Sequence, residues 1–213
     1  MQGNTKGQQP QEFKSVSAYP EIKVEDGEDK GIVEHLITVF GVLDMGRDVA
    51  HPGSFTKTID EREDRIRVVD SHRRQTVEGV VGVPIKIWEV SRADLPKPVQ
   101  DKYPEATGGV KALTQFLMDT VAGRETFLRI KAGAVSEFSY GYDTMDHDFT
   151  KGADGKQVRN LRTIRLWEYG PVVFGLNQAT EVVDVKSPQT PEPEQVPQGL
   201  LTSEEIEALT RHA

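Results

Sequence analysis

Short β-rich runs recur through the middle of this chain, and they constrain its fold more than any other feature. The segment 65–72, RIRVVDSH, alternates Ile66 and Val68 with arginines, which is the pattern of a half-buried strand. Pro84 forces a bend or an edge position within a longer run at 79–90. Further runs of this kind occupy residues 34–43, 134–144, 158–169 and 171–176. The pattern predicts at least six strands, mostly short.

One region with a different period interrupts these runs. Apolar residues between 108 and 123 recur at helical spacing, and they are Val110, Leu113, Phe116, Leu117 and Val121. We expect a helix here that ends at Gly123, followed by a shorter helix to Gly133. The pattern favours a mainly β fold with helices (α+β), a small closed or partly open barrel of about six to seven strands packed by helices.

Composition divides the chain into four parts. Residues 1–31 are polar and predict a flexible arm with a short strand near EFKSVSA, residues 12–18. Residues 32–185 form the folded domain, residues 186–200 are a proline-rich linker, and residues 201–213 read as a short helix.

Charge and cysteine content exclude several classes of protein. The chain has 26 Lys and Arg against 34 Asp and Glu, a net charge of -8, which disfavours nucleic-acid binding. It has no cysteine, so disulfides, thiolate metal sites and a cysteine nucleophile are excluded. It shows no apolar run of the roughly 20 residues that span a membrane and no secretory signal at its start. We expect a soluble protein that acts inside a cell, without nucleic-acid or membrane partners.

Two serines in the segment 134–144, AVSEFSYGYDT, are candidate nucleophiles. Ser136 and Ser139 point to opposite faces of a regular strand, so only one of them can share a site with a given base. His72 is the candidate base, because a histidine at a strand end beside a polar turn is both anchored and accessible. The alternative is an ordinary surface histidine.

A serine–histidine pair also needs a group that fixes the imidazole tautomer. Glu168 is the candidate, with Asp143 as a rival; alternatively, Glu168 is an ordinary strand-end carboxylate paired with Arg165 or Arg162. A metal-dependent hydrolase is a weaker alternative, since the chain has no HxxxH or HExxH pair, and we expect no metal or other cofactor. Its ligands would come from Asp70, His72, Asp146, His147 and Asp148.

Several motifs in order resemble one family. They are GVLDMGRDVAHPGSF, VVDSH, VVGVPIKIWE, GAVSEFSYGY and LRTIRLWEYGPVVFGLNQAT. This order, over about residues 32–182, resembles the tailed-phage (caudovirus) prohead serine proteases, capsid maturation enzymes related in fold to the herpesvirus assemblins. The resemblance implies that Ser139 is the nucleophile and His72 the general base, and it favours Glu168 as the third member.

The resemblance also bears on the surroundings of Ser139. Gly141 would leave room for the substrate backbone. Glu137 stands where a small residue is common, so we expect it to turn out to solvent through a bulge or twist before Ser139. Oxyanion or substrate-binding candidates are Arg162 and Arg165, with Arg73 as a third.

The resemblance implies a serine endopeptidase that processes scaffold and major capsid protein segments, and its own chain, during prohead maturation. It would act in the host cytoplasm inside the assembling prohead. The portal is a further partner that the resemblance admits, as is self-association into a homodimer or larger assembly. The alternative is a catalytically silent assembly or scaffold factor of the same fold.

Overall fold

The computed structural model describes residues 12–16 and 31–174. The predicted linker 186–200, the predicted helix 201–213 and most of the predicted arm lie outside the described residues. All described residues belong to one unit of the chain, residues 1–181. The short strand expected within the arm is present as β1, Glu12–Val16.

The described residues form a single mixed sheet. Its strands are β1 (Glu12–Val16), β2 (Ile32–Phe40), β3 (Asp48–Ala50), β4 (Arg67–Val69), β5 (Val80–Ser91), β6 (Gly108–Phe116), β7 (Glu137–Lys151) and β8 (Gln157–Val172). The order across the sheet is β1-β7-β8-β4-β5-β6-β2, and β3 pairs with β8 from outside this path. Most neighbours are antiparallel, but β4 and β3 run parallel to β8.

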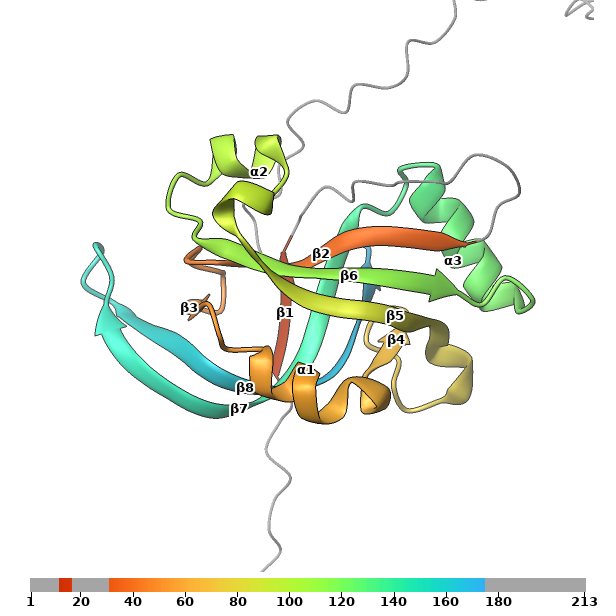
Figure 1. Ribbon diagram of the computed structural model, residues 1–213, viewed down its shortest axis with the longest axis horizontal. Helices are drawn as coiled ribbons and strands as arrows, with labels where there is room; N and C mark the ends of the chain where they lie inside the picture. Colours follow the sequence, from red (N-terminus) through yellow and green to blue (C-terminus); the bar gives the residue numbers. More distant parts are fainter. Residues whose placement is uncertain (1–11, 17–30, 175–213) are drawn as a thin grey trace, which may run out of the picture. The chain divides into compact units, whose positions relative to one another are not determined.

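The sheet curls until its two end strands approach each other (Figure 1). Side chains also pack across the curl between β2 and β7, the neighbour of β1. The His35 ring of β2 stacks on Phe138 of β7 with 3.7 Å between ring centroids. Inside the curl lies an aromatic core that includes Phe40, Phe55 and Tyr140, all at most 1% exposed. The expected mainly β, partly open barrel is therefore confirmed.

Three α-helices lie among the described elements: α1 (Thr56–Arg62), α2 (Lys97–Lys102) and α3 (Val121–Lys131). Single turns of 3₁₀ helix occur at Glu63–Arg65, Val77–Gly79 and Arg92–Asp94. Thr120 caps α3, because its side-chain oxygen accepts a hydrogen bond from the Gly123 N–H. The shorter helix expected up to Gly133 is thus present and begins earlier than predicted.

The prediction of a helix over 108–123 is wrong, because residues 108–116 form the strand β6. Val110, Ala112, Thr114 and Phe116 alternate with half-buried residues, which is the two-residue period of a strand. Val110, Leu113 and Leu117 lie at positions i, i+3 and i+7, a spacing that fits a helix, so the apolar residues alone matched both periods.

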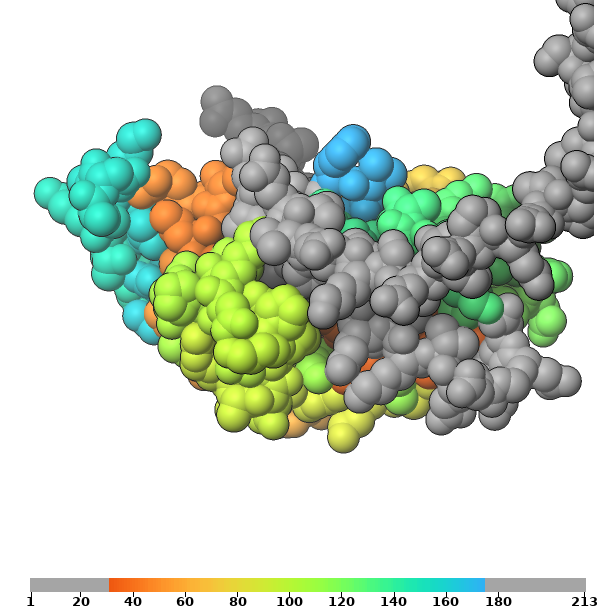
Figure 2. Space-filling view, turned by 90° about the horizontal axis from the view of Figure 1, so that it is seen from above, coloured from red at the N-terminus to blue at the C-terminus, as the bar shows by residue number. Residues whose placement is uncertain are grey.

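β7 and β8 form a long hairpin, whose tip stands beside the surface around β3 in Figure 2. Arg47 fixes the tip, since its guanidinium forms two 2.9 Å hydrogen bonds with the Asp154 carboxylate. His147 lies on β7. No helix in the described part of the chain is long and apolar enough to cross a membrane.

Candidate active site

His72 lies in a left-handed turn that follows β4. Ser71 and His72 have φ angles of 48° and 59°, a backbone region that residues other than glycine rarely adopt. The turn is held from both sides, because the Ser71 N–H donates to Pro171 O at 3.0 Å and the Asp70 N–H donates to Gly79 O at 2.9 Å. His72 is therefore three residues beyond the strand end, and not on the strand as the sequence suggested.

Asp70 adds side-chain contacts to the same turn. Its carboxylate accepts hydrogen bonds from Ser71 Oγ and from the Arg73 guanidinium, both at 2.7 Å. Two left-handed residues together cost on the order of 2–4 kcal/mol, so they persist only where surrounding contacts determine them. The conformation brings the imidazole back over β8.

Glu168 is the partner of that imidazole. His72 Nδ1 lies 2.8 Å from Glu168 Oε1, and Glu168 is 1% exposed. Within the described residues, the other carboxylate oxygen, Oε2, has no hydrogen-bond partner. A buried carboxylate without compensation is costly, so the contact with His72 stabilises both side chains where they lie.

Ser139 lies on β7 directly opposite Gly170 of β8, and Gly141 lies opposite Glu168. Residues opposite each other share a face of the sheet, so Ser139 and Glu168 are diagonal neighbours on one face, with Cα atoms roughly 7–8 Å apart. Ser139 is 2% exposed. Phe138 and Tyr140 point to the other face, into the core.

A bulge at Trp167 creates this arrangement. Leu166 pairs with Tyr142 and Glu168 pairs with Gly141, so β8 has one more residue than β7 between these pairs. Strict alternation would have placed Glu168 with Leu166 in the core. The extra residue moves it to the face of Ser139.

Two glycines make room for the site. A Cβ on Gly141 would overlap Glu168 Oε1, so the absent side chain leaves space for the carboxylate. The room that Gly141 would leave for a substrate backbone stays a prediction. A Cβ on Gly170 would overlap the Val69 carbonyl oxygen, so Gly170 allows the end of β4 to approach β8 closely. The sequence alone did not indicate this role of Gly170, because the role depends on the pairing of β4 with β8.

The chemistry of the pair follows from its geometry. An ionised carboxylate that accepts the Nδ1 proton holds the imidazole in the tautomer whose lone pair is on Nε2. That tautomer can take a proton from a serine hydroxyl. The catalytic roles of Ser139, His72 and Glu168 stay predictions, as does the absence of a metal; among the described residues no cluster of three or more His, Asp or Glu side chains could hold one.

The two predicted oxyanion arginines lie elsewhere. Arg165 and Arg162 precede Gly170 by five and eight residues, roughly 16 and 26 Å along an extended strand. Arg162 Nε donates to the Asp148 carboxylate at 2.6 Å, and the Arg165 guanidinium lies over the Trp167 ring, 5.9 Å from its centroid. These positions correct the expectation that either arginine binds an oxyanion at Ser139. Arg73 is bound to Asp70.

Glu137 also differs from expectation. The pairing of β7 with β8 is regular from Glu137 to Gly141, so no bulge precedes Ser139. Glu137 therefore lies on the face of Ser139, two residues away, and it is half-buried. Asp143, the rival of Glu168 for the third role, accepts a 2.9 Å hydrogen bond from the Trp167 indole and so supports the bulge instead.

A family model described as caudovirus prohead serine protease matches residues 103–193. The predicted resemblance to the prohead serine proteases is confirmed by this match. The matched region includes Ser139 and Glu168, while His72 lies before it. The match supports a role as a maturation protease.

Among solved structures, the bacteriophage T4 capsid assembly protease, gp21, is similar to this chain with a TM-score of 0.45 and 10% sequence identity. The similarity covers 76% of this chain and 93% of the T4 protein. A comparison with curated proteins gives no significant match.

Proposed function

We propose that this protein is a serine endopeptidase in which Ser139, His72 and Glu168 act together. The observation that carries the proposal is the 2.8 Å contact between His72 Nδ1 and the buried Glu168 carboxylate, on the face of the sheet to which Ser139 points. The family match over residues 103–193 supports the same reading.

In the proposed reaction, Ser139 Oγ attacks the scissile carbonyl carbon while His72 Nε2 takes the hydroxyl proton. The tetrahedral intermediate then collapses to an acyl-enzyme, and the imidazolium gives its proton to the leaving amine. Water, activated by the same imidazole, attacks the ester and releases the acid and free Ser139. Glu168 keeps the ring oriented and stabilises the imidazolium that forms in each half-reaction.

The proposed substrates are segments of the phage scaffold and major capsid proteins, cleaved inside the assembling prohead. The chain's own termini are proposed as further substrates, and they lie outside the described residues. The support for these substrates is the family match, since the family is that of prohead proteases.

Labelling with a fluorophosphonate tests the proposal, because this reagent selectively phosphonylates activated serines, with loss of fluoride. We expect the wild-type protein and the Ser136→Ala variant to be labelled, and the Ser139→Ala variant to remain unlabelled. Ser136 is a matched control, since it lies three residues from Ser139 and just before β7 begins. Equal labelling of the Ser139→Ala variant would contradict the assignment.

A second candidate is a catalytically silent assembly factor of the same fold. The observation that favours it is the burial of Ser139, which is 2% exposed and therefore offers little surface to a substrate. The same experiment separates the two candidates, because a silent factor leaves Ser139 unlabelled in the wild-type protein.

A further inference from the structure

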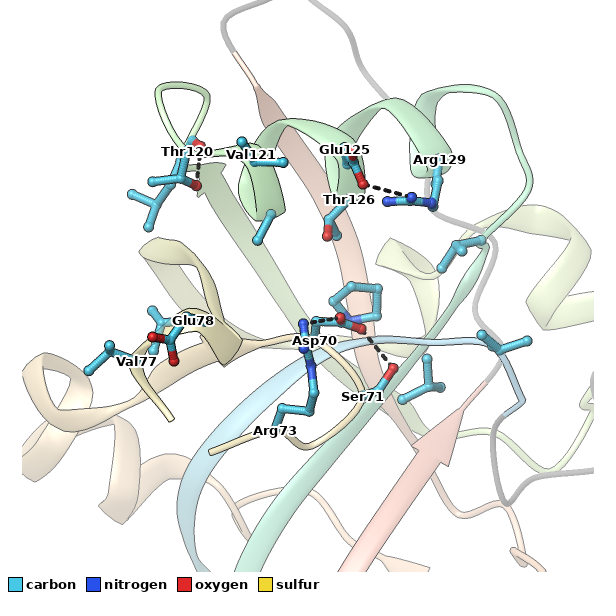
Figure 3. Close-up of a pocket in the computed structure, with 17 residues that line it drawn as sticks. Asp70, Ser71, Arg73, Val77, Glu78, Thr120, Val121, Glu125, Thr126 and Arg129 are labelled. Carbon is cyan, nitrogen blue, oxygen red and sulfur yellow. Dashed lines mark hydrogen bonds and ion pairs between the residues drawn. The ribbon is translucent and has the colours of Figure 1, made fainter. Parts of the chain in front are cut away.

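A groove lies between α3 and the turn that carries His72. Its volume is about 1040 Å³, just above the range of roughly 300–1,000 Å³ that ligand sites occupy. Figure 3 shows Val121, Glu125, Thr126 and Arg129 of α3 on one side, and Asp70, Ser71, Arg73, Val77 and Glu78 on the other. We call this space the α3 groove.

The α3 groove adjoins the proposed catalytic residues. Ser71, which lines it, directly precedes His72, and Asp70 anchors the same turn. Pro171 and Val172 also line it, and they directly follow Gly170, the residue opposite Ser139. A peptide bound with its scissile bond at Ser139 would therefore extend into this groove.

The lining is mainly aliphatic. Val77 and Val121 stand on opposite rims and are 83% and 77% exposed, so neither is used by the core. Exposed apolar side chains that face each other across a groove mark a surface that binds apolar groups. The remaining apolar lining residues are Val80, Leu117, Ala122, Val135, Pro171, Val172 and Val173.

The charges of the lining select against an acidic occupant. The Arg73 guanidinium is bound to Asp70 at 2.7 Å, and the Arg129 guanidinium is bound to Glu125 at 2.8 Å. Glu78 adds a third carboxylate to the rim. The lining thus has three carboxylates against two guanidinium groups, each of which already has a carboxylate partner.

We infer that the α3 groove is the specificity site of the protease and takes aliphatic side chains of an extended substrate peptide. This inference rests on the proposed function, because the position of the scissile bond is set by Ser139. The size of the groove suits a stretch of peptide, with Val77 and Val121 contacting its apolar side chains from either rim.

The test compares Val121→Glu with Leu128→Glu. Both residues are exposed aliphatic positions on α3, 77% and 44% exposed, but only Val121 of the two lines the groove. A randomised synthetic peptide library is the probe, and mass spectrometry gives the cleavage positions. We expect wild-type cleavage to be enriched for Val, Ile or Leu at a fixed position from the scissile bond. Val121→Glu should lower cleavage of those peptides by about 10-fold or more, whereas Leu128→Glu should not.

Fluorophosphonate labelling of Ser139 separates this inference from the proposed function. An unlabelled wild-type Ser139 would refute the proposed function itself. With Ser139 labelled equally in all three proteins, the inference is overturned if wild-type cleavage shows no aliphatic enrichment, or if Val121→Glu and Leu128→Glu behave alike. Because Val121 is exposed, its replacement removes no core contact, and thermal unfolding should confirm that both variants remain folded.

Discussion

At the scale of single residues, Gly141 determines where the Glu168 carboxylate can lie. A side chain at position 141 would meet the far end of Glu168, which can move, and not a backbone atom, which cannot. The cost of such a change should therefore fall on the orientation of His72 more than on folding. Ser139 itself, two residue pairs away along the hairpin, would keep its position.

We accordingly predict that Gly141→Ala lowers the rate of fluorophosphonate labelling of Ser139 by roughly 10-fold or more, because misplacing a catalytic group by about 1 Å can cost that much. Its unfolding free energy should fall by only about 1–3 kcal/mol, as for other overpacking changes. Gly46→Ala is the control, since its new Cβ would meet only side-chain atoms, Asp44 Oδ1 at 3.3 Å and Asp48 Oδ2 at 3.9 Å. If Ser139 in the Gly141→Ala variant were labelled at the wild-type rate, this result would argue against a role for Glu168.

At the scale of elements, the junction of β4 and β8 depends on Gly170. A Cβ added at position 170 would overlap the Val69 carbonyl oxygen, so the backbone of one strand must move. That movement would disturb the parallel pairing of Arg67 with Glu168 and the hydrogen bond from Ser71 to Pro171.

Gly170→Ala should thus lower the free energy of unfolding more than Gly141→Ala does, although Gly141 is the residue in contact with Glu168. We expect a loss of at least about 3 kcal/mol, the upper end of the overpacking range, measured by urea unfolding. The same Gly46→Ala control applies. A smaller loss for Gly170→Ala than for Gly141→Ala would show that β4 and β8 can separate without penalty.

The elements also show what the sequence could and could not predict. The alternation of Ile66 and Val68 predicted β4 correctly, because a half-buried strand records its burial in every second residue. Applied strictly, the same rule would place Glu168 on the core face with Leu166, since the bulge at Trp167 depends on pairing with a strand 25 residues away in sequence.

The contact between His72 and Glu168 was predicted from the sequence, whereas the backbone conformation that positions the two residues was not. His72, Ser139 and Glu168 were selected together through family motifs, and the structure joins His72 to Glu168. The left-handed turn at Ser71 and His72 could not be predicted, because neither residue type favours that conformation and contacts from Pro171 and Gly79 impose it. Neither could the α3 groove, whose lining comes from four separate segments.

At the scale of the whole molecule, a buried histidine links stability to pH. His35 is fully buried in the core, its Nε2 lies 3.0 Å from Thr114 Oγ1, and burial lowers its pKa from 6.5 to about 3. Below pH 6.5 the unfolded chain binds a proton at this histidine that the folded protein does not bind. The free energy of unfolding therefore falls as the pH drops from 6.5 towards 3.

We predict that His35→Leu removes this part of the pH dependence. Relative to the variant, the wild-type protein should lose about 2 kcal/mol between pH 6.5 and 5, at about 1.4 kcal/mol per pH unit. Thr114 Oγ1 keeps a partner in the variant, because it also lies 2.7 Å from Tyr169 OH. Urea unfolding at several pH values measures the difference, with exposed His147→Leu as the control. Parallel pH curves for wild type and His35→Leu would refute it.

The contact between His72 and Glu168 joins residues that are 96 positions apart in the chain. During synthesis, the ribosome delivers the imidazole first, then Ser139, and the carboxylate only with the last strand. Under the proposed function, a polypeptide whose translation stops before β8 contains a nucleophile and a base but nothing to orient them. Prematurely terminated products would then be inert fragments, and peptidase activity would first arise in chains that have been made to the end of the sheet.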